Sequence, residues 1–177
     1  AFLEQALDSV LRQSFSDLEL IISDNGSTDR TEEICRRYAA RDPRISYHRQ
    51  PENRGVSFNY RRAFELARGE YFQWLAHDDV LAPDFLQKCV AALDQDPGAV
   101  LCQSLIDLID ENGHRLTVYD SGVYGSRPST IFRHVVLKAH WCTELLGLIR
   151  ADALRKVSPY GQCHGADEIM IAELSML

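Results

Sequence analysis

In the first part of the chain, segments with apolar residues at helical spacing alternate with short continuous apolar runs. Four of them fall at helical spacing near the start: Leu3, Leu7, Val10 and Leu11. Residues 18–22 then form a short apolar run, which is typical of a buried strand. Further strands are expected at 45–48, 71–75 and 99–103, and further helices near 29–38, 57–68 and 83–95. This alternation predicts an α/β fold with a doubly wound, mostly parallel sheet.

The second part of the chain is less regular. Asn112-Gly113 lies between two apolar segments and predicts an antiparallel hairpin. A helix near 131–139, a strand near 145–149 and a last helix from about Asp167 complete the pattern. We expect a single domain over 1–177, divided into 1–103 and 104–177. Because the pattern opens on a helix and stops inside one, we also expect a first strand and a C-terminal part to be lacking.

Composition and charge narrow the possible functions. The chain has 177 residues, a net charge of −7 and 45% hydrophobic residues, which is ordinary for a globular domain. The negative charge disfavours nucleic acid as a partner, because such surfaces must neutralise phosphates. An anionic ligand would therefore need a cation or a locally basic pocket. The sequence has no apolar run of the roughly 20 residues that span a bilayer. Five scattered cysteines favour a reducing compartment.

Acidic residues follow two of the predicted strands. Asp24 ends the first strand and Asp78-Asp79 follow the third, and ligands of open parallel sheets bind at such carboxyl ends. Adjacent carboxylates repel each other unless a cation joins them, and hard oxygen ligands suit Mg²⁺ or Mn²⁺. For Asp24 the alternative is ordinary turn and cap chemistry. For Asp78-Asp79 it is a solvated acidic turn.

A third acidic pair, Asp167-Glu168, opens the last predicted helix. A carboxylate there can act as a general base toward a hydroxyl within hydrogen-bond reach. The alternative is stabilisation of the helix N-terminus by negative charge.

Taken together, several segments resemble family 2 glycosyltransferases of the GT-A fold. They follow one another in the order and spacing of that family: 7–14, 18–31, 53–55, 67–71 and 75–79. Residues 147–150 and Ala166-Asp167 match more loosely. The resemblance assigns 1–103 to a nucleotide-sugar-binding half and 104–177 to an acceptor-side half.

The resemblance implies transfer of a sugar from a nucleotide diphosphate sugar, with UDP as the expected nucleotide, to an acceptor hydroxyl with inversion. Asp24 is expected to recognise the nucleotide base, and Asn53 to lie in the same site. Asp78 is expected near the ribose. Asp79 is the expected ligand of Mn²⁺ or Mg²⁺, which bridges to the diphosphate.

On the acceptor side, the resemblance makes Asp167 the catalytic base, with Glu168 as the alternative. The expected acceptor is a glycan, a lipid-linked group or another hydroxyl compound, in cell-surface polysaccharide or glycolipid synthesis. We expect a cytoplasmic location, possible also at the inner face of the membrane as a peripheral protein.

The sequence departs from the family pattern at several positions. His77 stands where the family commonly has Asp, Asn59-Tyr60-Arg61 replaces Ala-Arg-Asn, and Ala166 replaces the usual Glu. The segment His140-Trp141-Cys142 could line an acceptor site, although a tryptophan in the core is the more common outcome. Trp74 is expected in the core. Two other functions compete: nucleotidyl transfer, which would need a glycine-rich phosphate loop, and sugar or nucleotide binding without chemistry.

Overall fold

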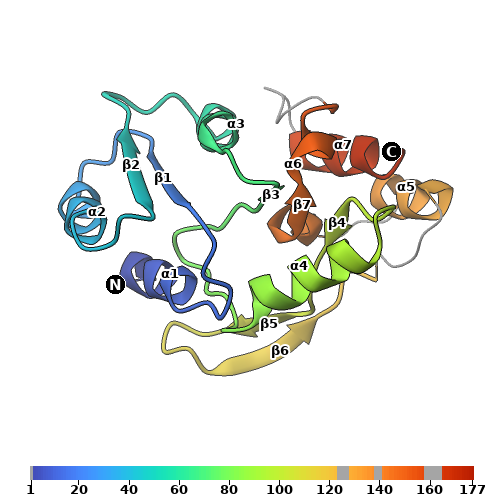
Figure 1. Ribbon diagram of the computed structural model, residues 1–177, viewed down its shortest axis with the longest axis horizontal. Helices are drawn as coiled ribbons and strands as arrows, with labels where there is room; N and C mark the ends of the chain where they lie inside the picture. Colours follow the sequence, from blue (N-terminus) through green and yellow to red (C-terminus); the bar gives the residue numbers. More distant parts are fainter. Residues whose placement is uncertain (1, 123–127, 138–140, 158–164) are drawn as a thin grey trace.

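The computed structural model describes residues 2–122, 128–137, 141–157 and 165–177 (Figure 1). Helices and strands interleave, which confirms the expected α/β class. The first half contains α1 Phe2–Leu11, β1 Leu20–Asp24, α2 Thr31–Ala39, β2 Ile45–Arg49, α3 Val56–Leu66, β3 Tyr71–Phe72, α4 Phe85–Gln95 and β4 Leu101–Cys102. The second half contains β5 Ile106–Ile109, β6 Arg115–Tyr119, α5 Pro128–Leu137, η1 Thr143–Leu146, β7 Leu148–Arg150, α6 Ala151–Leu154 and α7 Ala166–Leu174.

The strands of the described residues pair in separate sheets. β1 and β2 are parallel, with Leu20 opposite Ile45 and Asp24 opposite Arg49. β7 lies between β3 and β4 and is antiparallel to both, so β3 and β4 run in the same direction. The parallel arrangement predicted for the first hundred residues is therefore interrupted by a strand from the second half of the chain.

The strand predicted at 145–149 begins later than expected. Thr143–Leu146 form the 3₁₀ turn η1, and β7 starts at Leu148. Gly147, between them, passes close to β4, because a Cβ added there would lie 2.8 Å from the carbonyl oxygen of Cys102. The absence of a side chain at this position lets β7 approach β4.

β7 divides the core into two clusters. Successive side chains of a strand point to opposite faces, and Leu148 packs with Leu86 and Leu93 of α4, whereas Ile149 packs with Met170 of α7. Leu93, Ile149 and Met170 are all 0% exposed. In Figure 1, α4 lies on one side of this sheet and α6 and α7 on the other. This arrangement fixes the start of α7 relative to β3.

A cavity of about 1100 Å³ lies between β1 and β3. In the described part of the chain, β1 pairs only with β2 and β3 pairs only with β7, so an edge of each strand borders the cavity. Most of its wall is apolar, and the residues that line it come from α1, β1, α3, the segment 67–77 around β3, and α4. One end is polar and contains Asp24, Asn25, Asn59, Tyr60 and His77.

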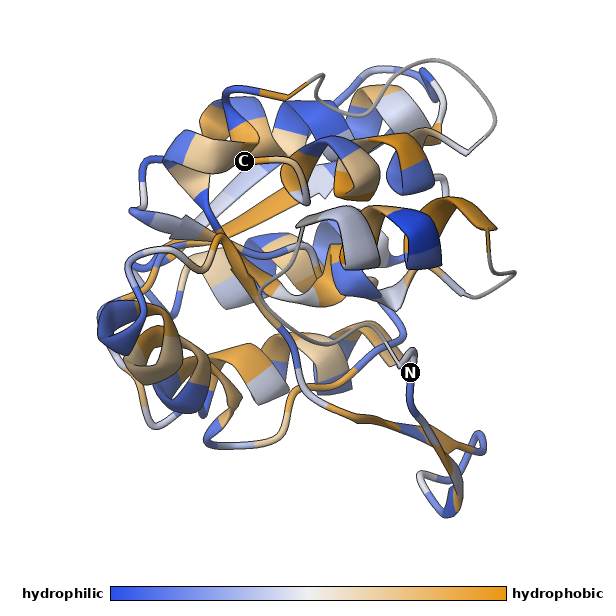
Figure 2. Cartoon of the chain, turned by 90° about the vertical axis from the view of Figure 1, so that its right-hand side faces the viewer, coloured by the Kyte–Doolittle hydropathy of each residue, from blue (hydrophilic) through white to orange (hydrophobic). Residues whose placement is uncertain are grey.

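The β5–β6 hairpin confirms the turn predicted at Asn112-Gly113. Gly113 has φ +83°, and its amide donates to the carbonyl oxygen of Asp110 over 3.0 Å. In Figure 2 the hairpin extends away from the helices. No helix in the described residues is long and apolar enough to span a bilayer.

Candidate active site

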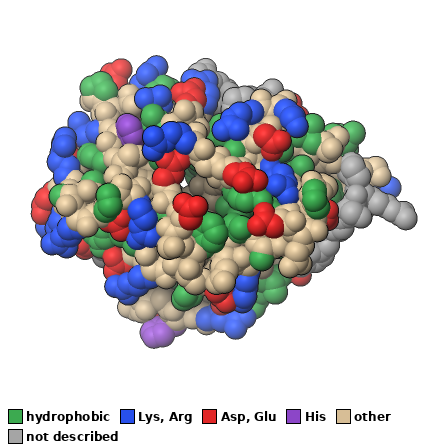
Figure 3. All heavy atoms as spheres, viewed as in Figure 1, with side chains coloured by type: hydrophobic (Ala, Val, Ile, Leu, Met, Phe, Trp, Pro, Cys, Tyr) green, Lys and Arg blue, Asp and Glu red, His purple; other side chains and the backbone are tan. Residues whose placement is uncertain are grey.

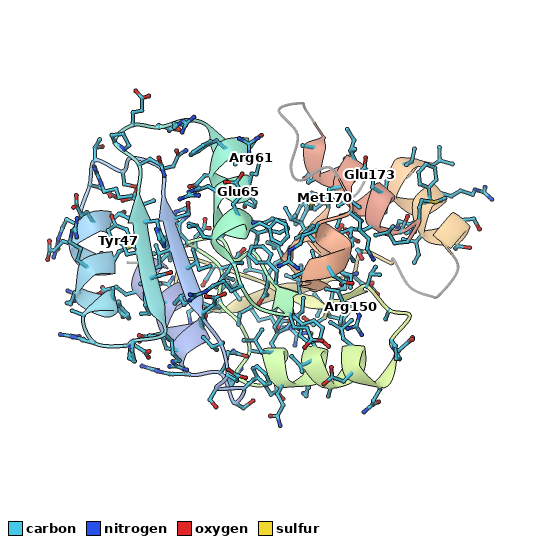
Figure 4. All side chains as sticks on the ribbon, turned by 45° about the horizontal axis from the view of Figure 1, so that its top comes forward. Tyr47, Arg61, Glu65, Arg150, Met170 and Glu173 are labelled. Carbon is cyan, nitrogen blue, oxygen red and sulfur yellow. The ribbon has the colours of Figure 1, made fainter. Side chains whose placement is uncertain are left out.

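Asp24 ends β1 and is held entirely by protein groups. Its side chain is fully buried, accepting hydrogen bonds from the Ser27 amide over 2.8 Å and the Tyr47 hydroxyl over 2.6 Å. Arg49 Nε lies 3.5 Å from the same carboxylate. Figure 4 places Tyr47 on β2, the strand beside β1. Burial alone would raise the pKa of Asp24, but these hydrogen bonds and the Arg49 charge outweigh it and lower the pKa.

The loop after β1 is joined to the loop after β2. Asn25 Nδ2 donates to Asn53 Oδ1 over 2.8 Å, and the Arg54 amide donates to Asn25 Oδ1 over 2.9 Å. Asn53 Oδ1 also accepts from the Gly55 amide over 2.9 Å. Gly26, with φ +76°, allows the close approach, because an added Cβ would lie 2.6 Å from the carbonyl carbon of Glu52.

These bonds give Asp24, which lines the cavity, and Asn53 structural roles in the two loops. Both side chains expected to contact the nucleotide thus also hold the loops in shape. Direct contact of Asp24 with the base, and of Asn53 with the nucleotide, stays a prediction. The alternative weighed for Asp24, turn chemistry, describes what its carboxylate does here.

Asp78 and Asp79 differ from Asp24 in almost every respect. They lie in an irregular stretch beyond β3, and both residues are exposed. Asp78 has His77 Nδ1 3.7 Å from its carboxylate, whereas no described residue donates a hydrogen bond to the carboxylate of Asp79. Protein atoms crowd that carboxylate and raise its pKa, and the negative charge of Asp78 raises it further, against a smaller opposing effect of His77.

Two adjacent carboxylates without donors fit a divalent cation with hard oxygen ligands. No group of three or more His, Cys, Asp or Glu residues suited to a metal occurs in the described residues. Asp79 and Asp78 would therefore supply only part of a coordination shell. Phosphate oxygens and water would have to complete it, which is the usual way that Mg²⁺ sites are built around phosphate ligands.

Asp167 lies in the first turn of α7. The residue before the helix, Gly165, has a left-handed backbone conformation with φ +74°. Asp167 is half-buried and Glu168 is exposed, and the helix N-terminus favours negative charge at both.

The acidic stretch after β3 and the start of α7 both act electrostatically on Tyr60 of α3. Burial raises the pKa of the Tyr60 hydroxyl, and so do the charges of Asp79, Asp78 and Asp167. The Tyr60 ring packs beside Trp74 with centroids 6.0 Å apart, and the Trp74 indole donates to the Tyr60 carbonyl oxygen over 3.0 Å. The phenol thus lies within electrostatic range of both acidic segments.

The loop after β1 and His77, which directly precedes Asp78, line the same cavity. Asp24 and Asp29 line the cavity together with His77, and the charge of His77 lowers the pKa of Asp29 after the larger effect of hydrogen bonds from Thr31. Acidic side chains surround a hollow near the middle of the face in Figure 3. The loop after β1, helix α3 and His77 after β3 therefore line the same cavity. Tyr60 was not among the site residues expected from the sequence, and its departure from the family pattern was the available signal.

The expectation of a core position holds for Trp74 and fails for Trp141. Trp74 is 5% exposed and packs edge-on against Phe72 with centroids 4.6 Å apart. Trp141 is 64% exposed. His140 lies outside the described residues.

Solved structures with the same fold include two proteins bound to nucleotide sugars. The TarS fragment of S. aureus in complex with UDP-GlcNAc has a TM-score of 0.75 and 19% identity, over 99% of this chain and 50% of that one. A mannosyltransferase of Pyrobaculum calidifontis, in complex with GDP-Man and Mn²⁺, has a TM-score of 0.66 and 22% identity, over 94% and 46% of the two chains. The expected GT-A type of α/β fold is thus confirmed.

The chain belongs to Glycosyl transferase family 2, whose profile matches residues 1–158. An uncharacterised glycosyltransferase of Nostoc is 31% identical over 162 residues, or 89% of this chain and 49% of its own length. The chondroitin synthase of Escherichia coli is 31% identical over 116 residues, or 66% of this chain and 17% of its own length. The chain spans about half or less of the length of these relatives.

Proposed function

We propose that the protein transfers a sugar from a nucleotide diphosphate sugar, with UDP as nucleotide, to an acceptor hydroxyl with inversion at the anomeric carbon. The observation that carries the proposal is that Tyr60 of α3 lines the cavity beside Asp24 and His77, and that its hydroxyl feels the charges of Asp78, Asp79 and Asp167. Membership in the family and neighbours solved with UDP-GlcNAc and with GDP-Man and Mn²⁺ support a nucleotide-sugar donor.

Donor binding uses the polar end of the cavity. The loops held by Asp24 and Asn25 present a rigid wall, and the Asp78-Asp79 pair would hold Mn²⁺ or Mg²⁺. Such an ion, when bound, supplies positive charge against the diphosphate. It also resolves the charge conflict between an anionic donor and a protein of net charge −7.

Asp167 is the proposed catalytic base. Its carboxylate takes the proton of the acceptor hydroxyl while that oxygen forms a bond to the anomeric carbon. The bond between the anomeric carbon and the diphosphate oxygen breaks at the same time, and its electron pair leaves with the nucleoside diphosphate. Attack from the face opposite the leaving group gives inversion.

The biological setting that fits this chemistry is synthesis of a cell-surface polysaccharide or glycolipid. The likeness to a chondroitin synthase supports a glycan product. A cytoplasmic site of action, as a soluble protein or at the inner face of the membrane, follows from the use of nucleotide sugars and belongs to the same proposal.

A panel of nucleotide sugars, tested for hydrolysis and transfer with and without Mn²⁺, examines the proposed function. We expect turnover of a UDP-sugar that requires the metal. Metal-independent sugar binding without turnover would instead identify a binding module, and release of pyrophosphate from a nucleoside triphosphate would identify a nucleotidyltransferase.

A further inference from the structure

Trp141 and Tyr119 form an exposed aromatic pair in the acceptor-side half. Their rings are stacked, with centroids 5.1 Å apart and an interplanar angle of 21°. Trp141 is 64% exposed, more than any other described Phe or Trp side chain. Apolar surface of this size is costly to leave in water, and on a soluble protein such a patch often marks a ligand site.

The pair is held in a defined position. The backbone amide of Trp141 donates to the Tyr119 hydroxyl over 3.0 Å, which joins the segment before η1 to the end of β6. Tyr119 lies in the register of the hairpin, opposite Ile106 of β5. The exposed position of the indole is therefore fixed by a backbone hydrogen bond and by the pairing of β6 with β5.

The stacked pair of Trp141 and Tyr119, called the platform, is linked through Cys142 to the helix that carries the proposed catalytic base. Cys142 follows Trp141 directly; burial raises the pKa of its thiol, and the charges of Asp167, Glu144 and Glu168 raise it further. The turn η1, which begins at Thr143, also contacts α7. Cys142 also packs against the core cluster that contains Met170 of α7, so the aromatic pair is joined to a segment in contact with this helix.

We propose that Trp141, supported by Tyr119, binds a pyranose ring of the acceptor and positions its hydroxyl toward Asp167. This inference rests on the proposed function and adds that the acceptor is a carbohydrate. A pyranose has an apolar face of C–H groups whose positive edge suits the negative face of an aromatic ring.

Fluorescence of the full chain tests the platform without requiring turnover. Trp74 is 5% exposed and Trp141 64%, so a ligand that stacks on the surface changes the emission of Trp141. We would titrate unlabelled disaccharides and tetrasaccharides of glucose, galactose and N-acetylglucosamine. We expect a saturable change with at least one of them in the wild-type protein, its retention in Leu116→Ala, and its loss in Trp141→Ala. Leu116, on the same strand as Tyr119, is a matched exposed apolar control at 68%.

Kinetics then separate acceptor binding from donor binding. In Trp141→Ala we expect the KM for the acceptor to rise about tenfold, with hydrolysis of the donor and affinity for UDP unchanged. Trp141→Phe, which keeps an aromatic face, should recover most of the loss. An unaltered acceptor KM in Trp141→Ala, or a fluorescence change in no wild-type titration, would overturn the platform.

Failure of the proposed function gives a different result. If the wild-type protein neither binds UDP nor turns over any nucleotide sugar, the transferase assignment fails. The disaccharide and tetrasaccharide titrations still decide the platform, because their signal depends on Trp141 and not on the donor.

Discussion

The loop after β1 and the acidic stretch after β3 carry similar residue types and use them in opposite ways. The carboxylate of Asp24 is fully buried and bonded by Ser27 and Tyr47, with Arg49 nearby. Asp79 is exposed and receives no hydrogen bond from a described residue. Internal bonding stabilises the first region, whereas Asp78 and Asp79 repel each other and no described residue donates a hydrogen bond to the Asp79 carboxylate. The difference teaches that acidic residues after two strands of one fold can differ completely in how the protein bonds them.

The largest effect is expected on turnover. Asp167→Asn removes the proposed base without changing its size, so transfer should fall by a factor of about 10²–10⁴. Glu168→Gln is the matched control in the same helix turn, and its transfer rate should fall less than about tenfold. Initial rates with saturating donor and acceptor measure both, and UDP affinity should be unchanged. Equal losses in the two variants would remove the distinction between these carboxylates.

The second largest effect is expected on the free energy of unfolding, for a substitution at Asp24 in the loop after β1. Asp24→Ala leaves the Tyr47 hydroxyl, the Ser27 amide and Arg49 without their buried partner, and should lower the free energy of unfolding by about 3 kcal/mol. Asp79→Ala should change it by less than about 0.5 kcal/mol, because that residue is exposed and its carboxylate accepts no hydrogen bond. Urea unfolding followed by circular dichroism gives both values. Comparable destabilisation in the two variants would contradict the contrast.

A smaller effect on the free energy of unfolding is expected from substitutions at two glycines, Gly26 and Gly55, in the loops after β1 and β2. Gly26 and Gly55 have φ of +76° and +88°, so alanine is strained at both and should cost about 1 kcal/mol. Only at Gly26 would the added Cβ meet backbone, at 2.6 Å, whereas at Gly55 nothing lies within 4 Å. Gly26→Ala should therefore lose about 2 kcal/mol more than Gly55→Ala, as measured by urea unfolding. Similar losses would mean that the two loops do not need their close contact.

The smallest expected effect concerns pH. The pKa of Asp24 is lowered on folding, so the stability it contributes is present above its ordinary value of 3.8 and is lost as the pH falls below it. Wild-type stability should decline more steeply than that of Asp24→Asn between about pH 5 and pH 3. Urea midpoints across this range measure the slopes. A parallel decline in both proteins would show that Asp24 is not responsible.

The sequence predicted most elements of the fold because their signals are local. Asn112-Gly113 between apolar runs is sufficient to predict the hairpin, and Ala166-Asp167 marks the start of α7 within a residue. The strand at 145–149 was wrong in its first half, because an apolar run does not distinguish a strand from a short 3₁₀ turn. The antiparallel insertion of β7 between β3 and β4 is a long-range event that no local pattern specifies.

The candidate site was predictable in position but not in detail. Acidic residues after strands and at a helix start directed attention to Asp24, Asp79 and Asp167; Asp24 lines the cavity, and the charges of Asp79 and Asp167 act on Tyr60, which also lines it. Bonding partners such as Tyr47 depend on the register of β1 and β2, which the sequence does not reveal. The exposure of Trp141 was equally inaccessible, because tryptophan is usually covered and only tertiary packing decides the exception.

Titration calorimetry of UDP with and without Mn²⁺, on the wild-type protein and on Asp79→Ala, tests the central claim most directly. Glu111→Ala removes an exposed acidic residue at the tip of the β5–β6 hairpin and serves as the control. The account predicts Mn²⁺-dependent UDP binding in the wild type and the control, weakened at least about tenfold in Asp79→Ala. UDP binding that is the same without Mn²⁺, or undiminished in Asp79→Ala, would contradict a metal-bridged donor site at the end of β3.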